Sequence, residues 1–233
     1  MTPVAGQAIE EFVRDTLPDD VAVAELVGEL GDDALLPEET SALGSVRSIR
    51  HLEFARGRWC AHEALRRLDP GLAGLPVLIG ANGREPVWPL GVRGSITHCP
   101  GYAAAAAGSV DYLAIGIDVE QDLVLPSRVR ERIVTAADLS GLTELETSFP
   151  DGPAWDRLVF CAKEAAYKAW FPVERTWLDF RDAVVSIDPV RSTFDAEFVG
   201  ARAAGAVLMP GRITGRIGYW DGFIAAAVAV RRR

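Results

Sequence analysis

The sequence predicts an α+β fold made of two halves. The first half covers residues 1–120 and begins with a helical pattern that gives way to short strands. The second half covers residues 121–233 and repeats this order, helices first and strands afterwards. Strands and helices do not alternate along the chain, so the pattern does not favour a parallel βαβ array.

The helices of the first half have recognisable start and stop signals. Residues 3–15 have the pattern of a short amphipathic helix, and Val21–Leu26 that of a strand. Pro37 followed by two glutamates begins a helix well, since proline suits the first turn and acids suit the positive end of the dipole. This helical pattern, broken once, runs to Leu68 and ends at Asp69–Gly71.

Strands and turns follow in the rest of the first half. Val77–Ile79 is a short apolar run, and the Asn-Gly pair within residues 81–86 indicates a turn. Three further strands are expected at Gly94–His98, Tyr102–Gly108 and Tyr112–Glu120, with turn residues between them. Because the connections are short, we expect these three strands to form an antiparallel meander.

The second half repeats the order with longer helices. Helical patterns cover Ser127–Ala137 and Gly141–Phe149, and a strong amphipathic pattern covers Trp155–Trp170 and stops before Pro172. The remaining chain predicts four strands: Trp177–Ile187, Thr193–Val199, Arg212–Gly218 and Phe223–Val230.

Composition limits the function classes. A net charge of −9 and an isoelectric point of 4.9 argue against nonspecific nucleic-acid binding, although a local basic cluster can still bind an anion. The three cysteines are far apart and form no metal-binding or disulfide pattern. The sequence begins without a signal-peptide pattern and holds no apolar run of roughly 18 residues. We therefore expect a cytoplasmic protein without membrane or nucleic-acid partners.

The placement of lysine is unusual. Of the 24 Lys and Arg residues, only Lys163 and Lys168 are lysines, and they flank Glu164 in one helical segment. Lysine is a compact charge with a tunable pKa, whereas arginine is a rigid planar fork. The chain therefore needs ammonium groups at this point, or else Glu164 and Lys168 form an exposed ion pair one helical turn apart.

A pair of carboxylates ends the clearest strand. Asp118 and Glu120 are two positions apart and project from the same side, while Ile117 and Val119 face a core. Two such close carboxylates repel each other unless a cation or protons compensate, and Mg²⁺ prefers oxygen ligands. The alternative is a strand end that faces water.

Candidate phosphate ligands occur upstream. Thr97 and His98 end the strand at residues 94–98, and a histidine there can donate to a phosphate or simply lie at the surface. Arg84 lies on a loop, and its planar fork matches phosphate oxygens.

Three ordered segments resemble the motifs of the Sfp-type 4′-phosphopantetheinyl transferases. They are GSITHC at residues 94–99, GIDVE at 116–120 and FCAKEAAYKAW at 160–170. The upstream REPVWP at 84–89 and ARGRWCA at 55–61 are similar to the siderophore-synthetase and actinobacterial branch. The resemblance covers roughly residues 45–170, and Phe160 stands where many members have tryptophan.

The resemblance implies a fold and a set of site residues. The family fold is a pair of α+β halves related by a pseudo-twofold axis, with coenzyme A bound between them. Asp118, Glu120 and Glu164 match the Mg²⁺ ligands, and Mn²⁺ is an alternative metal. The residues that match coenzyme A contacts are Arg50, Arg58, Arg84, Thr97, His98, Lys163 and Lys168.

The implied reaction moves the 4′-phosphopantetheine group of coenzyme A to a serine of an acyl or peptidyl carrier protein. Adenosine 3′,5′-bisphosphate leaves. Glu164, or a water on the metal, takes the serine proton, and Lys168 helps to place the base. The carrier proteins of fatty acid, polyketide and nonribosomal peptide synthesis all remain candidate partners, and we expect a monomer.

Two other functions use the same residues. A Mg²⁺-dependent phosphohydrolase would direct water at a nucleotide pyrophosphate and release free phosphopantetheine. A noncatalytic binder of coenzyme A or of carrier proteins would yield neither product, and it would not need three metal-binding acids.

Overall fold

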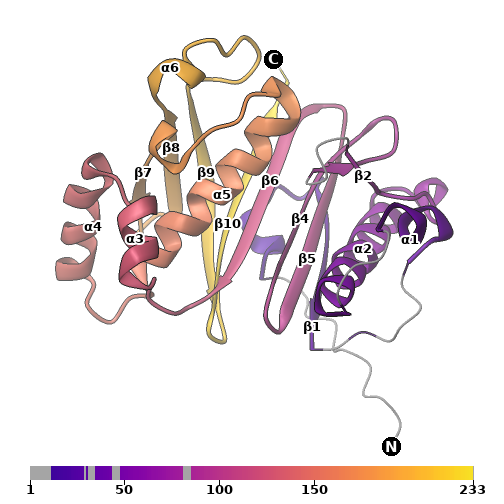
Figure 1. Cartoon of the computed structure of the whole chain (residues 1–233), viewed down its shortest axis with the longest axis horizontal. Coiled ribbons are helices and arrows are strands. Elements are labelled where there is room, and N and C mark those ends of the chain that lie inside the picture. Colours follow the sequence, from indigo (N-terminus) through magenta and orange to yellow (C-terminus); the bar gives the residue numbers. More distant parts are fainter. Residues whose placement is uncertain (1–11, 29, 31–34, 44–47, 81–84, 233) are drawn as a thin grey trace, which may run out of the picture.

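The computed structural model describes residues 12–28, 30, 35–43, 48–80 and 85–232. The helix predicted over residues 3–15 falls mostly outside them, and its described end is a 3₁₀ turn at Arg14–Thr16. Two antiparallel sheets lie side by side, each with a long helix packed on it (Figure 1).

The smaller sheet has three strands in the order β1-β5-β4, with bounds Ala22–Val27, Tyr102–Ser109 and Val92–Cys99. Helix α2 (Ser48–Leu68) packs on β5 and β1, and small residues on the facing strands allow close packing. Helix α1 (Pro37–Leu43) lies beside a two-stranded ribbon of β2 (Leu78–Ile79) and β3 (Pro86–Val87). A 3₁₀ turn at Pro70–Leu72 follows α2.

The larger sheet has five strands in the order β6-β10-β9-β8-β7. Their bounds are Tyr112–Gln121, Phe223–Arg231, Arg212–Trp220, Thr193–Phe198 and Ala183–Asp188. Helix α5 (Trp155–Glu174) crosses this sheet and buries an apolar face that includes Leu158, Ala162 and Trp170.

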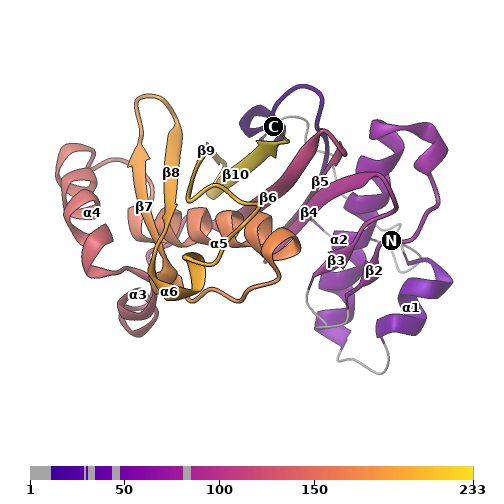
Figure 2. The ribbon, with the colours of Figure 1, turned by 90° about the horizontal axis from the view of Figure 1, so that it is seen from above.

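Shorter elements complete the second half. Figure 2 shows α3 (Ser127–Ile133) and α4 (Ala136–Ser148) at one end of the molecule and α1 and α2 at the other. A 3₁₀ turn at Phe180–Asp182 precedes β7, and the short α6 (Gly200–Ala203) follows β8. Neither α6 nor β3 was predicted from the sequence. The boundary at residue 120 between the two halves stays a prediction.

The predicted meander is wrong at its third strand. β4 and β5 pair as expected, but β6 forms its ladder with β10 and lies next to β4 instead. Two hydroxyls bridge this contact, because Ser95 Oγ accepts from the Ile117 N–H at 3.1 Å and Thr97 Oγ1 accepts from the Val119 N–H at 3.0 Å. We call this β4–β6 contact the seam, and it joins the two sheets.

The predicted end of the long helix is also wrong. Pro172 lies inside α5, which continues to Glu174. Proline cannot donate one of the helical hydrogen bonds. The loss is tolerated here because it falls in the last turn, which needs only a residue that caps the end of the helix. Arg175 is this residue, in a left-handed conformation with φ of 54°, and its N–H donates to the Phe171 carbonyl at 3.0 Å. Among the described residues, no helix combines the length and the hydropathy that a membrane span requires.

Candidate functional site

The close approach of α5 to β6 positions the candidate site. At Gly116, an added Cβ would lie 2.0 Å from the Ala165 carbonyl oxygen and 2.8 Å from the Ala169 nitrogen. Only glycine therefore permits this distance between helix and strand. Cys161 reinforces the contact, since its thiol donates to the Asp118 carbonyl at 3.1 Å. The packing brings Glu164 and Lys168 over the end of β6 that carries Asp118 and Glu120.

Asp118 is the centre of the resulting cluster. Its Oδ1 accepts from the Thr97 hydroxyl at 3.1 Å and from the Lys168 ammonium at 2.7 Å. Lys168 also donates to the Ile117 carbonyl at 3.1 Å, so its ammonium is held by the strand backbone. Thr97 therefore serves both as the bridge of the seam and as a support for Asp118. The structure brings together three sequence-predicted residues, each from a different element.

Two carboxylates in the cluster have unused oxygens. Asp118 Oδ2 is buried and has no hydrogen-bond partner. Among the described residues, Glu164 also has no hydrogen bond or ion pair, although the charges of Asp118 and Lys168 both act on it. A buried oxygen without a donor, such as Asp118 Oδ2, is costly, and a divalent cation between the two carboxylates would satisfy it. The donor set therefore fits a hard metal ion.

Glu120 is engaged elsewhere. Its Oε2 accepts from Arg157 at 3.1 Å, and the described residues form no group of three or more candidate ligands arranged for a metal. A metal held by all three acids would thus require Glu120 to turn from Arg157. Arg157 was not among the predicted site residues, although it lies two helical turns before Glu164 on the same face of α5.

The pKa shifts of the cluster indicate that its carboxylates lack positive charge. Burial, followed by the charge of Asp118, raises the pKa of Glu120 to about 7. The same two causes raise the pKa of Glu164. Burial by itself lowers the pKa of Lys168, but Asp118 and Glu164 outweigh it and the net pKa is raised. The cluster therefore keeps its one ammonium charged and would gain from another cation.

His98 stands at the exposed end of β4, next to Thr97. Removal of water from around the ring, followed by the charge of Lys168, lowers the pKa of His98. The ring is therefore neutral at pH 7 and keeps one N–H donor. Because the charge of Lys168 acts on the ring, His98 and Lys168 are two donors in one region of the seam.

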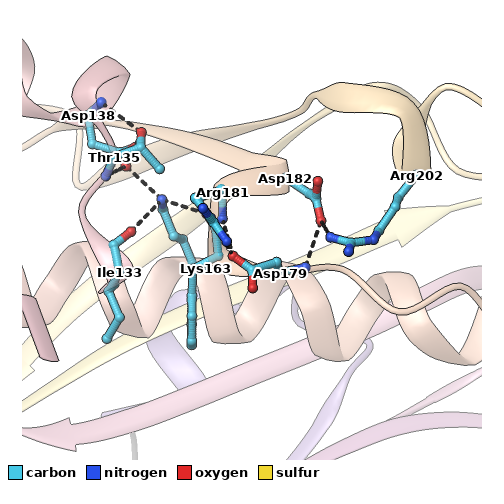
Figure 3. A network of polar contacts seen from close by, with 9 residues as sticks. Ile133, Thr135, Asp138, Lys163, Asp179, Arg181, Asp182 and Arg202 are labelled. Carbon is cyan, nitrogen blue, oxygen red and sulfur yellow. Dashed lines mark hydrogen bonds and ion pairs between the residues drawn. The ribbon is translucent and has the colours of Figure 1, made fainter. Parts of the chain in front are cut away.

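Lys163 is not part of this cluster. Its ammonium is buried and donates to Asp138 at 2.6 Å and to the carbonyls of Ile133 and Phe180 at 2.9 Å each (Figure 3). These three bonds use all its donors. Asp138 in turn accepts from the Val185 N–H at 2.9 Å and closes the capping box of α4 with Thr135. The geometry places Lys163 in a structural anchor that joins α3, α4 and α5.

The three candidate arginines lie away from the seam or outside the described residues. Arg58 is buried on α2, stacks on Phe54 at 4.2 Å, and donates from Nη2 to the Leu78 carbonyl at 3.2 Å. Burial lowers the pKa of Arg58 to about 10, and its Nε has no partner. Arg50 is exposed near the start of α2. Arg84 lies outside the described residues.

Two grooves share Glu164, Tyr167 and Trp177 in their linings. One has a volume of about 650 Å³ and is lined by Phe160, Tyr167 and Trp177 together with residues of α3. The other has a volume of about 800 Å³ and runs between β4 and α5, beside Ser95 and Lys168. A ligand with an anionic part and a long apolar arm could therefore reach the cluster along either groove.

Two family models match the chain. Residues 38–108 match the 4′-phosphopantetheinyl transferase N-terminal domain, and residues 114–203 match the 4′-phosphopantetheinyl transferase superfamily. The chain is 37% identical over 195 residues to the 4′-phosphopantetheinyl transferase PptT of Mycobacterium tuberculosis, an alignment that covers 83% of each chain. The chain belongs to the 4′-phosphopantetheinyl transferase family.

Other relatives place it within that family. The transferase Svp of Streptomyces mobaraensis is 39% identical over 200 residues, which cover 84% of this chain and 78% of the relative. The transferase Npt of Nocardia iowensis is 34% identical over 237 residues, covering 94% and 99%. These relatives confirm the actinobacterial type of phosphopantetheinyl transferase that the motifs predicted. The α+β fold predicted from the sequence is confirmed as well.

Proposed function

We propose that this transferase moves the 4′-phosphopantetheine group of coenzyme A to a serine hydroxyl of a carrier protein and that the seam is its active site. One observation carries the assignment of the site. Asp118 keeps one buried oxygen without a partner while its other oxygen accepts from Lys168, and Glu164, which has no hydrogen bond or ion pair among the described residues, lines both grooves. Phosphoryl transfer needs positioned positive charge around a diphosphate, and this cluster can assemble it.

Asp118, Glu120 and Glu164 are the residues that would hold Mg²⁺, or Mn²⁺ in its place. The metal would neutralise charge that develops on the diphosphate. Arg157 holds Glu120 at 3.1 Å and would release it when the metal binds.

The chain's own donors position the diphosphate. Lys168 and His98 would contact diphosphate oxygens, while Thr97 fixes Asp118 through its hydroxyl. Lys168 is already oriented by the Ile117 carbonyl, so little freedom is lost when the substrate arrives.

Glu164 is the proposed general base. The serine oxygen attacks the phosphorus next to pantetheine, and its proton passes to Glu164. The bond between that phosphorus and the bridging oxygen breaks, and adenosine 3′,5′-bisphosphate leaves with that oxygen.

The ends of coenzyme A bind to opposite parts of the molecule. Arg58, with its unpartnered buried Nε, and Arg50 on the same helix contact the nucleotide end, together with Arg84, which lies outside the described residues. The pantetheine arm lies in the groove lined by Phe160, Tyr167 and Trp177.

The carrier protein approaches at α3. The chain is acidic overall, so attraction of an acidic carrier protein needs a local basic patch. Arg128 and Arg132 are exposed on α3, Val129 is 40% exposed beside them, and Arg132 lines the mouth of a groove that reaches Glu164. Arg130 is engaged by Glu146 at 3.4 Å and contributes less.

Intact-mass spectrometry tests the function. An apo acyl carrier protein and an apo peptidyl carrier protein are each incubated with this protein, coenzyme A and Mg²⁺, with a chelator in a parallel sample. The proposal predicts a gain of one phosphopantetheine group that the chelator abolishes. Free phosphopantetheine without a mass gain would instead support the hydrolase, and coenzyme A binding without either product would support the noncatalytic binder.

A further inference from the structure

Arg56 on α2 has an unsatisfied guanidinium. Its Nε and Nη2 are buried and have no hydrogen-bond partner, and no described carboxylate forms an ion pair with it. Other arginines of the same helix have partners, since Arg66 and Arg67 both form ion pairs with Glu63. Buried donors without acceptors destabilise a protein, so a ligand with acceptor oxygens would remove an existing cost.

The surroundings of Arg56 place it near the seam. Its neighbour Gly57 lies so close to β4 that an added Cβ would meet Ile96 Cγ2 at 2.9 Å. Ile96 is two residues before His98. The charge of Arg56 also reaches the ring, because it adds to the effects of burial and Lys168 that lower the pKa of His98. Arg56, His98 and Lys168 thus contribute positive charge or donors to one region.

The side chains of Arg56 and Arg58 point to different parts of this region. Residues two positions apart on a helix point about 200° apart around its axis. Arg58 donates to the Leu78 carbonyl at the β2 side of α2, whereas Arg56 influences His98 and Cys99 at the end of β4. The two side chains therefore leave α2 in different directions.

We propose that Arg56 is a further substrate-binding residue that donates to the diphosphate of coenzyme A, beside His98. The inference rests on the proposed function and deepens it. The diphosphate is the anionic group that belongs next to His98 and Lys168, and it supplies the acceptors that Arg56 lacks. A guanidinium fork also matches the geometry of phosphate oxygens.

Steady-state kinetics with Arg56→Gln test this assignment. The variant keeps a hydrogen-bonding side chain but loses the charge and the fork. We expect the KM for coenzyme A to rise by about 10-fold or more, with a smaller change in kcat, since the contact exists before and during transfer. The matched control is Arg66→Gln, on the exposed side of the same helix, which should leave both constants unchanged.

Coenzyme A and 3′-dephospho-coenzyme A separate the two phosphate sites. A contact to the diphosphate predicts the same relative rise of KM for both substrates in Arg56→Gln. A rise for coenzyme A alone would place Arg56 on the 3′-phosphate and overturn the diphosphate assignment.

Thermal unfolding distinguishes binding from a structural role. Loss of an unpartnered buried charge should leave the Tm of the ligand-free variant unchanged or raise it, while the Tm increase caused by coenzyme A becomes smaller. A lower ligand-free Tm with an unchanged KM would show a structural role and overturn the proposal. Wild-type protein that binds coenzyme A but transfers nothing would refute the proposed function, and the Tm shift would still report on Arg56.

Discussion

At the scale of single residues, the two lysines have different tasks. Lys163 is 3% exposed and bonded to Asp138 and two carbonyls, whereas the Lys168 side chain is 27% exposed and bonded to Asp118 at the seam. Removal of one partner of a buried ion pair leaves a charge without compensation. The unusual lysine placement therefore reflects two roles, one in stability and one proposed in catalysis.

This difference predicts opposite effects of two substitutions. Lys163→Met should lower the free energy of unfolding by about 3–5 kcal/mol, because Asp138 is left charged in the interior. Lys168→Met should cost less stability but abolish most transfer by the folded protein. Denaturant unfolding and transfer rates per folded molecule measure both effects.

The double variant Lys163→Met, Asp138→Leu is the control. It removes both charges together and should recover most of the stability that Lys163→Met loses. A Lys163→Met variant with native stability would contradict the structural assignment.

Sequence reasoning found some site residues and missed others for physical reasons. Asp118 and Thr97 were found because strand alternation and the motif resemblance place them at strand ends. Ser95 was missed, although it lies on the same strand face as Thr97, since its bond to the Ile117 N–H depends on β6 lying beside β4. Nothing in the local pattern revealed that contact. The functional roles assigned to the site residues stay predictions.

At the scale of elements, the contact between α5 and β6 determines the site geometry. Gly116 allows this contact because a Cβ would lie 2.0 Å from the Ala165 carbonyl. We predict that Gly116→Ala pushes α5 away from β6, lowers the free energy of unfolding by about 1–3 kcal/mol and reduces transfer. Denaturant unfolding and the transfer assay measure the two effects.

Gly141→Ala is the matched control. Gly141 lies in α4 with nothing within 4 Å of its added Cβ, so alanine there should be neutral or stabilise the helix by about 0.5–1 kcal/mol. Equal effects of the two alanines would contradict the role of close packing at Gly116.

A buried carboxylate joins the elements of the first half. Glu39 of α1 accepts from the Val77 N–H at 2.8 Å and the Leu36 N–H at 3.1 Å, and its Oε1 lies 2.8 Å from His62 Nε2. Burial raises the pKa of Glu39, but these hydrogen bonds outweigh burial and the net pKa is lowered from 4.5. The ionised form is therefore more stable in the folded chain than in the unfolded chain.

The lowered pKa fixes the sign of a pH effect. A depressed folded-state pKa contributes stability above the unfolded value of 4.5, and this contribution is lost as the pH falls through the folded value. Glu39→Gln should therefore be less stable than wild type at pH 7, and the difference should shrink below about pH 4.5.

Urea unfolding at several pH values measures this difference. Glu38→Gln, at an exposed neighbouring position of α1, serves as the control and should follow wild type throughout. A difference that stays constant from pH 7 to pH 4 would refute the assigned linkage.

Most helices and strands followed from local pattern, but their pairing did not. The helical pattern over residues 37–68 agrees with α1 and α2, and the last three expected strands agree with β8–β10, whereas the strand expected at Trp177–Ile187 begins only at Ala183. The meander failed because short connections favour pairing of consecutive strands without determining it. β6 obtains its ladder from β10, which is about a hundred residues away in the chain.

At the scale of the whole molecule, the seam couples the two sheets. A hydrophobic cluster crosses it, with Tyr102 and Ala104 from β5 packed with Ile117 and Val119 from β6 and Ala225 from β10. A close-packed core is hard to deform. The positions of the site residues on the two sheets therefore stay fixed relative to each other. The sequence motifs predicted Thr97 and Asp118 as site residues, but only the contact between β4 and β6 in the folded protein places them next to each other.

The most direct test of the central claim is the transfer activity of Glu164→Gln, measured by intact mass of an apo carrier protein with coenzyme A and Mg²⁺. Glu144→Gln, an exposed position on α4, is the control and should behave like wild type. The account predicts that Glu164→Gln keeps its fold by circular dichroism and loses at least about 100-fold of the transfer rate, since it removes the proposed base. Transfer by folded Glu164→Gln at a rate near that of wild type would contradict the account.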